Sequence, residues 1–189
     1  MALYKKQVVL ASTSPRRREL IEIVCDNVVL AASNAEEVLP YEMAPADAAV
    51  YLAGLKAQSV FDERGGKEIV IGCDTIVDLN GKVLGKAPDE EGALQMLASL
   101  AGNTHMVHSG VCIISPEKRV EFVCTSKVTF KPMTRDEMME IIVKDKVLDK
   151  AGSYAIQGVA SMFVEKIEGE FYNIVGLPVA KLYEALKTF

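Results

Sequence analysis

The chain has 189 residues, of which half are apolar and a quarter are charged, as in an ordinary soluble globular protein. Its formal net charge of −5 argues against a general nucleic-acid-binding protein, which is usually basic. No apolar run is long enough to span a membrane, and the first residues lack the apolar region of a signal peptide, so we expect a cytoplasmic protein.

The length allows one sizeable domain or two closely packed lobes. No repeat, low-complexity tract or linker divides the chain, and we therefore expect a single domain over residues 1–189. The four cysteines form no Cys-x-x-Cys pair, so we expect them to be reduced and mostly buried, without a zinc site.

Predicted strands and helices alternate in the first part of the chain. The predicted strands cover residues 8–10, 28–32 and 68–72. Ser14 suits a helix N-cap and Pro15 suits the first helical position, so a helix begins directly after the first strand. Apolar residues at helical spacing predict a second helix over residues 45–61.

The middle of the chain is predicted to contain hairpins. The first is indicated by Asn80-Gly81, which suits a type I′ turn between two short strands. The further predicted strands cover residues 76–79, 82–84, 107–114, 120–129, 154–157 and 162–167. The further predicted helices begin at Asp89, at the capping box Thr134–Glu137 and at Pro178. This order predicts an α/β domain with a mixed sheet rather than a doubly wound parallel sheet.

The segment from Ser12 to Arg18 is the strongest single indication of chemistry. It places serine hydroxyls, three arginines and the free N–H groups of a helix start next to one another. Such an arrangement favours a phosphate site. A solvated basic first turn of an ordinary helix explains the same residues equally well.

Three later segments also carry polar groups. Asp74 and Thr75 follow the apolar run 69–71, so we expect them at the carboxyl end of a strand, where α/β proteins bind ligands; a turn or cap is the alternative. Lys86 lies between a hairpin and a helix start, and it could equally be a solvated surface lysine. Residues 149–158 form a polar loop bracketed by glycines, which is either functional or a plain connection.

Neither phosphate-binding glycine motif, GxxxxGK[ST] or GxGxxG, is present. His105 and His108 are spaced to point in opposite directions on a strand, so they need not share a site.

Taken together, the polar segments resemble the Maf family of nucleoside triphosphate pyrophosphatases over nearly the whole chain. The matching segments are Ala11-Ser12-x-Ser14-Pro15-Arg16-Arg17, Glu36-Glu37, Lys56, Gly72-Cys73-Asp74-Thr75, Gly85-Lys86, Gly102-x-x-His105, residues 149–158 and Val175-Gly176-Leu177-Pro178. The resemblance implies an elongated α/β fold with two lobes around a central cleft, similar to the inosine triphosphate pyrophosphatases. It also implies a homodimer.

The implied reaction is hydrolysis of a nucleoside triphosphate to a monophosphate and pyrophosphate with a divalent cation, Mg²⁺ or Mn²⁺. The Ala-Ile-Gln-Gly form of the late loop resembles the branch that acts on dTTP and UTP, with modified pyrimidine triphosphates as further candidates. A branch that acts on 7-methyl-GTP carries a glutamate at the position of Gln157. The family is also associated with septum formation, so a nucleotide-binding regulator with little turnover is the alternative function.

The resemblance also assigns roles to single residues. Asp74 matches the catalytic proton acceptor, and Arg16, Thr75 and Gln157 match the positions that select the substrate. The other matching cleft residues are Ser14, Arg17, Glu37, Lys56 and Lys86.

These roles agree with elementary chemistry. A triphosphate needs cations and N–H donors, which the Ser14–Arg17 turn, Lys56 and Lys86 can supply, so we expect a basic cleft in an acidic protein. Asp74 and Glu37 can hold a hard divalent cation, and whether Asp74 is a base or a metal ligand stays open. The Gln157 amide can both donate to and accept from a uracil or thymine edge, whereas an ionised glutamate only accepts.

Two positions depart from the family pattern. The usual Gly-Lys-Pro is Gly85-Lys86-Ala87-Pro88 here, and the small residue before the aspartate is Cys73, which can be oxidised.

Overall fold

One mixed sheet of seven strands runs through this computed structural model, which describes residues 3–189. The strands are β1 (Val8–Ala11), β2 (Val28–Ala31), β3 (Val70–Leu79), β4 (Lys82–Leu84), β5 (Thr104–Ile114), β6 (Arg119–Phe130) and β7 (Val164–Glu168). Their order is β2-β1-β3-β5-β6-β7, and β4 pairs with β3. β1 is parallel to β2 and β3, and every other pair is antiparallel, which confirms the predicted mixed sheet.

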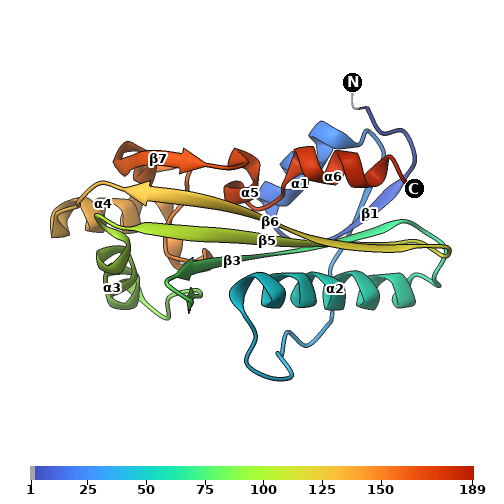
Figure 1. The fold of residues 1–189 in the computed structure, drawn as a ribbon, viewed down its shortest axis with the longest axis horizontal. Helices are drawn as coiled ribbons and strands as arrows, with labels where there is room; N and C mark the ends of the chain where they lie inside the picture. The colour runs from blue at the N-terminus through green and yellow to red at the C-terminus, as the bar shows by residue number, and fades with distance from the viewer. Residues whose placement is uncertain (1–2) are drawn as a thin grey trace.

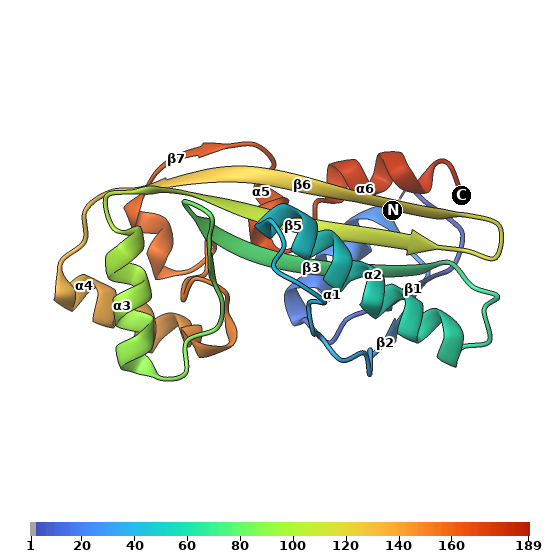
Figure 2. The ribbon, with the colours of Figure 1, turned by 60° about the horizontal axis from the view of Figure 1, so that its bottom comes forward.

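The helices lie mostly at the two ends of an elongated molecule, with one short helix near its middle (Figures 1 and 2). They are α1 (Pro15–Val24), α2 (Pro45–Glu63), α3 (Glu90–Leu100), α4 (Arg135–Asp145), α5 (Phe171–Val175) and α6 (Val179–Leu186), with the 3₁₀ turns η1 (Val147–Asp149) and η2 (Val159–Phe163). In Figure 1, α2 lies across the sheet from α1 and α6 at one end, and α3 and α4 lie at the other end. Within residues 3–189, no helix has both the length and the apolar character that a membrane crossing requires.

The long strands β3, β5 and β6 connect the two ends of the molecule (Figure 2). Strands that run from one end to the other are what a single domain with two lobes requires. The assignment of the whole chain to one domain stays a prediction.

Most of the local sequence signals are confirmed. The side chains of Ser14, Asp89 and Thr134 cap α1, α3 and α4, and Thr134 forms the full capping box with Glu137. The Asn80-Gly81 turn joins β3 to β4. The four cysteines are free thiols, three of them buried and Cys124 half-buried, as expected.

Three expectations about elements are wrong. The predicted strands 68–72 and 76–79 belong to one continuous strand, β3, because β5 pairs with it along nearly its whole length. Residues 154–157 form no strand: Tyr154 and Ala155 are irregular, Ile156 and Gln157 lie in a turn, and none of the strands described in residues 3–189 pairs with them. Residues 171–175, for which no helix was expected, form α5.

Alternate residues of β1 and β3 point to opposite faces of the sheet and pack into different apolar cores. Leu10 and Ile71 point to the larger core, which also contains the buried residues of α1, α3, α4 and α6. Val9 and Val70 point to a smaller core, which Ala53 and Ala57 of α2 complete. Because side chains alternate between the two faces of β1 and β3, helices can pack on both faces of the sheet at this end.

Helix α2 lies unusually close to the sheet because two strand positions have no side chain. A Cβ atom on Gly72 would lie 2.2 Å from the carbonyl oxygen of Ala53, and one on Gly110 would lie 2.2 Å from the carbonyl of Ala49. Both glycines are therefore required by the approach of the helix backbone rather than by strand geometry. The close approach also sets the depth at which the α2 side chains meet β3.

We predict that Gly110→Ala destabilises the protein by about 3 kcal/mol, because the added methyl group would overlap the backbone of α2 and force it outward. Urea unfolding measures this change. Gly85→Ala is the matched control, since a Cβ atom at Gly85 meets nothing within 4 Å. Equal stability losses in the two variants would show that α2 has room to move.

Candidate active site

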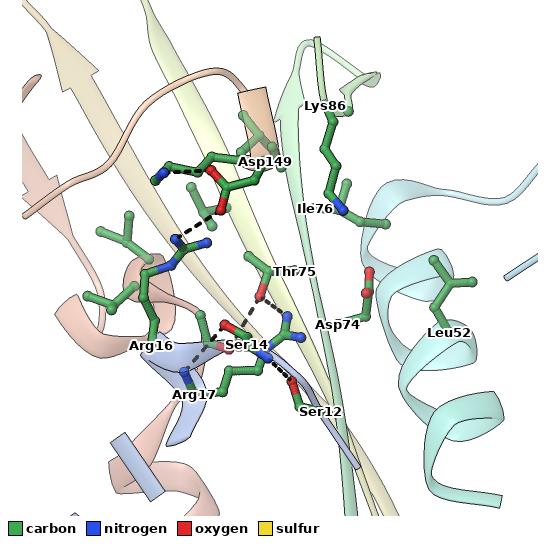
Figure 3. A pocket seen from close by; sticks show the side chains of 18 of the residues that line it. Ser12, Ser14, Arg16, Arg17, Leu52, Asp74, Thr75, Ile76, Lys86 and Asp149 are labelled. Atoms are coloured by element: carbon green, nitrogen blue, oxygen red, sulfur yellow. Dashed lines mark hydrogen bonds and ion pairs between the residues drawn. The ribbon is translucent and has the colours of Figure 1, made fainter. Parts of the chain in front are cut away.

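A cleft of about 700 Å³ lies between the two ends of the molecule. All of the site residues expected from the sequence line this one cleft, and they are Ser14, Arg16, Arg17, Glu37, Lys56, Asp74, Thr75, Lys86 and Gln157. They come from the start of α1, the loop after β2, helix α2, strand β3 and the loops after β4 and η1. Figure 3 shows several of these side chains converging on the cleft.

The cleft opens where strand β3 loses its neighbour. β1 pairs with β3 only as far as Gly72, and β4 pairs with it only from Val77 onward. Between these points, β3 has a paired strand on one side only, namely β5. Asp74 and Thr75 lie in this open stretch, so the expectation that they end a strand is wrong: the neighbour β1 ends there, and β3 continues.

The start of α1 forms one wall of the cleft. The Ser14 hydroxyl accepts the N–H of Arg17 at 3.5 Å, and the Ser12 hydroxyl accepts the N–H of Ser14 at 3.2 Å. The first turn contains no acidic residue. The positive end of the helix dipole and two arginines thus face the cleft together, an arrangement that favours an anion.

Two hydrogen bonds fix the Arg17 guanidinium in this wall, and Figure 3 shows the one to Thr75. Its Nε donates to the carbonyl oxygen of Gly176 at 2.9 Å, and its Nη2 donates to Thr75 Oγ1 at 3.0 Å. Gly176 ends α5 with a φ of 131°, a conformation that favours glycine. The same carbonyl accepts the Cys73 thiol at 3.3 Å, and burial raises the pKa of that thiol, so Cys73 stays protonated.

A lysine joins two carboxylates on the opposite wall. Lys56 Nζ, on α2, lies 2.5 Å from Asp74 Oδ1 and 3.0 Å from Glu37 Oε2. The side chains of Lys56 and Asp74 are only 12% and 14% exposed, whereas Glu37 is 52% exposed. The two carboxylates therefore lie within reach of a single cation, in a partly buried setting where charge pairing is strong.

Two oxygen donors of this kind fit a hard divalent cation. Mg²⁺ is commonly held by one or two carboxylates, together with water and substrate phosphates. Within residues 3–189, no group of three or more His, Cys, Asp or Glu side chains converges on a metal position. The protein would therefore supply Asp74 and Glu37, and the remaining ligands would come from a bound phosphate and water.

Arg16 and Lys86 enter the cleft with fewer restraints. Arg16 Nη1 lies 3.9 Å from Asp149 Oδ2, and Lys150 Nζ lies 2.6 Å from Asp149 Oδ1. Burial opposes ionisation of Asp149, but the Lys150 hydrogen bond and the charge of Arg16 outweigh it and lower the pKa of the carboxyl. Lys86 is exposed, and Figure 3 shows its side chain extending into the pocket.

Backbone hydrogen bonds and one buried side-chain contact hold the loop that carries Gln157 in place. The Gly152 N–H donates to the carbonyl oxygens of Leu84 and Gly85, so the loop is bound to the segment that carries Lys86. Tyr154 Oη lies 2.8 Å from His105 Nε2, and both side chains are buried. Gln157 itself is exposed at the cleft. His105 and Tyr154 each lie in a segment that matches the family pattern, Gly102-x-x-His105 and residues 149–158, but their separation of 49 positions hid the contact.

The two histidines have separate surroundings, as expected. His105 faces Tyr154 and Phe130, whereas His108 lies 3.3 Å from Asp78 and 2.8 Å from Thr125. Burial lowers the pKa of His105 from 6.5 to about 4, so the ring is neutral at pH 7.

Comparison with known proteins identifies the family. A family model described as "Maf-like protein" matches residues 7–189. The chain belongs to the Maf-like family. The site residues named above all lie within the matched range.

Relatives of the Maf-like chain carry an enzyme name. A protein named dTTP/UTP pyrophosphatase from Bacillus cereus (strain G9842) is 44% identical over 184 residues, which cover 97% of this chain and 96% of that protein. A protein of the same name from Bacillus mycoides (strain KBAB4) is 42% identical with the same coverage. The solved structure of the Staphylococcus aureus Ham1 protein matches at a TM-score of 0.49 and 16% identity, covering 66% of this chain and 72% of that one.

We predict that His105 makes the stability of the protein depend on pH between about 6.5 and 4. In this window the unfolded histidine binds a proton and the folded one does not, so stability falls as the pH falls. The loss attributable to His105 between pH 7.5 and pH 5 is on the order of 2 kcal/mol.

The measurement is urea unfolding of the wild type and His105→Gln at both pH values. The stability difference between the two proteins should shrink at pH 5, because the variant has no ring to protonate. His108→Gln serves as the control for losing a histidine elsewhere on β5. A difference that is the same at both pH values would contradict the assignment.

Proposed function

We propose that this chain hydrolyses dTTP and UTP to the monophosphate and pyrophosphate. The observation that carries the proposal is the convergence of all nine expected residues on one cleft, in a chain whose relatives are named dTTP/UTP pyrophosphatases. A cleft lined by both cations and carboxylates suits a triphosphate that must be bound and then cleaved at the phosphoanhydride bond between its α and β phosphates.

The triphosphate would lie against the start of α1. Arg17 is held rigidly by Gly176 and Thr75, and the neighbouring Ser14–Arg17 turn presents the positive end of the helix dipole. Lys86 approaches from the loop after β4 and adds an exposed positive charge. These groups would neutralise the phosphates and orient the bond to be cleaved.

Asp74 and Glu37 would hold the divalent cation, Mg²⁺ or Mn²⁺, together with phosphate oxygens. A bound cation of this kind polarises the phosphoryl group and stabilises the charge of the pyrophosphate that leaves. Lys56 now bridges the two carboxylates, and it keeps both oriented toward one point while neutralising part of their mutual repulsion.

Asp74 is also our candidate for the group that accepts a proton from the attacking water. It lies on the open stretch of β3, and Lys56 contacts one of its two oxygens. The second oxygen has no hydrogen-bond partner among the described residues, so it is available to a water molecule at the cleft. A carboxylate in this position can orient the water and take its proton as the new bond forms.

The nucleobase would be selected by Gln157, Arg16 and Thr75. Gln157 is exposed at the cleft, and its amide offers one acceptor and two N–H donors. Uracil and thymine present a carbonyl acceptor next to the N3–H donor, and the glutamine amide can donate to that carbonyl while the N3–H goes to a neighbouring acceptor such as Thr75. A glutamate in its place would repel the carbonyl edge.

The alternative function is a nucleotide-binding regulator of septum formation with little turnover. Both functions need the cations of the cleft, but only hydrolysis needs Asp74 placed beside them. Complementation of a strain lacking the protein by wild type and by Asp74→Asn would separate the two, because a regulator that only binds nucleotides would survive the substitution.

We predict that the purified protein releases pyrophosphate from dTTP and UTP in the presence of Mg²⁺ or Mn²⁺, and that Asp74→Asn reduces kcat by about 10³-fold or more. The amide can neither accept the proton nor bind the cation as a carboxylate does. Chelation of the metal should abolish activity in the wild type.

Asp89→Asn is the matched control for Asp74→Asn. It removes the same charge at the N-cap of α3, outside the cleft, where asparagine caps a helix equally well. Wild-type protein that leaves dTTP and UTP intact would overturn the proposed function, and near-normal turnover by Asp74→Asn would remove Asp74 from the chemistry.

For selectivity, we predict that Gln157→Glu lowers kcat/KM for dTTP and UTP by about tenfold or more, because the new carboxylate cannot donate to the base. Steady-state kinetics with single nucleotides measure the change. Gln95→Glu, on the exposed side of α3, provides the same charge change away from the cleft. Identical substrate preferences in the wild type and Gln157→Glu would exclude this role.

Several further expectations stay predictions. They are the cytoplasmic location, the homodimer, the single-domain organisation and the extension of the activity to modified pyrimidine triphosphates.

A further inference from the structure

A row of buried polar groups leads from the cleft wall into the sheet. Thr75 Oγ1 lies 2.9 Å from Ser109 Oγ, its cross-strand neighbour on β5. Ser109 donates to the carbonyl oxygen of Asn173 at 3.0 Å. Asn173 Nδ2 donates to the Val107 carbonyl and to Ser126 Oγ, each at 3.0 Å. Ser109, Asn173 and Ser126 are fully buried, and none of them lines the cleft.

The direction of these hydrogen bonds follows from the number of hydrogens. A serine hydroxyl has one hydrogen, and that of Ser109 goes to the Asn173 carbonyl. Thr75 must therefore be the donor toward Ser109. The other acceptor near Thr75, the carbonyl of Gly176 at 3.4 Å, also belongs to the protein. In either case the Thr75 hydrogen points away from the cleft.

The Thr75 hydroxyl can therefore act toward a ligand in the cleft only as a hydrogen-bond acceptor, through its oxygen. One of its lone pairs accepts Arg17 Nη2 at 3.0 Å, and the other can accept an N–H from a ligand. A phosphate oxygen offers no hydrogen to such an acceptor, whereas the N3–H of uracil or thymine does. The direction of the row thus makes Thr75 suitable for a base with a ring N–H and unsuitable for phosphate.

We propose that Ser109 is a positioning residue that acts through Thr75 to fix Arg17 in the cleft and to keep Thr75 an acceptor. The proposal rests on the proposed function in that the ligand of the cleft is a pyrimidine nucleoside triphosphate. Without the Ser109 hydroxyl, the Thr75 hydrogen must turn to the cleft or to the Gly176 carbonyl. At that carbonyl it competes with Arg17 Nε, which is bound there at 2.9 Å.

The main experiment compares Ser109→Ala with Ser126→Ala. Both serines are fully buried, lie on neighbouring strands and donate to a backbone carbonyl, but only Ser109 contacts Thr75. We expect Ser109→Ala to lower kcat/KM for dTTP and UTP by about three- to tenfold, mainly through KM, as the loss of one hydrogen bond would. Ser126→Ala should stay within about twofold of the wild type while losing similar thermal stability. Equal kinetic effects would overturn the proposal.

A double-mutant cycle tests whether Ser109 acts through Thr75. In a Thr75→Val background the hydroxyl that Ser109 orients is absent, so adding Ser109→Ala should change kcat/KM by less than about twofold. If the two effects multiply as in independent sites, the proposal is wrong. Ser109→Cys, which keeps a weak acceptor of similar size, should restore part of the lost kcat/KM.

A third measurement does not depend on turnover. Hydrogen exchange of the Arg17 Nε–H can be followed by NMR, with the signal assigned by its loss in Arg17→Lys. We expect faster exchange in Ser109→Ala than in the wild type and in Ser126→Ala. Unchanged exchange in Ser109→Ala would overturn the positioning role even in an active enzyme. A wild type that does not cleave dTTP or UTP would overturn only the proposed function.

Discussion

The close contact between α2 and the sheet is the constraint on which the cleft depends. Because Gly72 and Gly110 carry no side chain, the α2 backbone lies directly on β3 and β5. One turn along the helix, Lys56 then reaches Asp74 at 2.5 Å in a partly buried position. With ordinary side chains at the two glycines, the helix would lie farther out, and the ammonium group would be left in solvent, where its attraction for the carboxylate is weak.

The second constraint is the interruption beside β3. A strand that is paired on both sides has no free edge, and its side chains point only above or below the sheet. Here β1 ends opposite Gly72 and β4 begins opposite Val77, so Asp74, Thr75 and Ile76 border the cleft directly. Asp74 and Thr75 leave the strand on opposite faces, yet both line the cleft. One short stretch thereby serves the carboxylate wall and the arginine wall together.

The charge of the cleft is opposite in sign to the net charge of the whole molecule. The protein has a net charge of −5, whereas the charged residues that line the cleft are mostly basic. The basic residues are Arg16, Arg17, Lys56, Lys86 and Lys150, and the acidic ones are Glu37, Asp74 and Asp149. Pairing within the cleft holds several of these charges at defined positions before any ligand binds. Such preorganisation lowers the reorganisation that a highly charged ligand would otherwise require.

The amino-acid sequence by itself determined the features that depend on neighbours a few residues away. The Ser14 cap, the Thr134–Glu137 capping box and the Asn80-Gly81 turn each bond to backbone within four residues, so their chemistry is visible locally. Motif spacing, through the family resemblance, also identified the nine cleft residues. Only the tertiary structure decided how those residues meet, since Arg17 and Gly176 are 159 positions apart and Thr75 and Ser109 are 34 apart. The continuity of β3, the absence of a strand at 154–157 and the buried row behind Thr75 follow from strand pairing and burial, which arise only when distant segments come together.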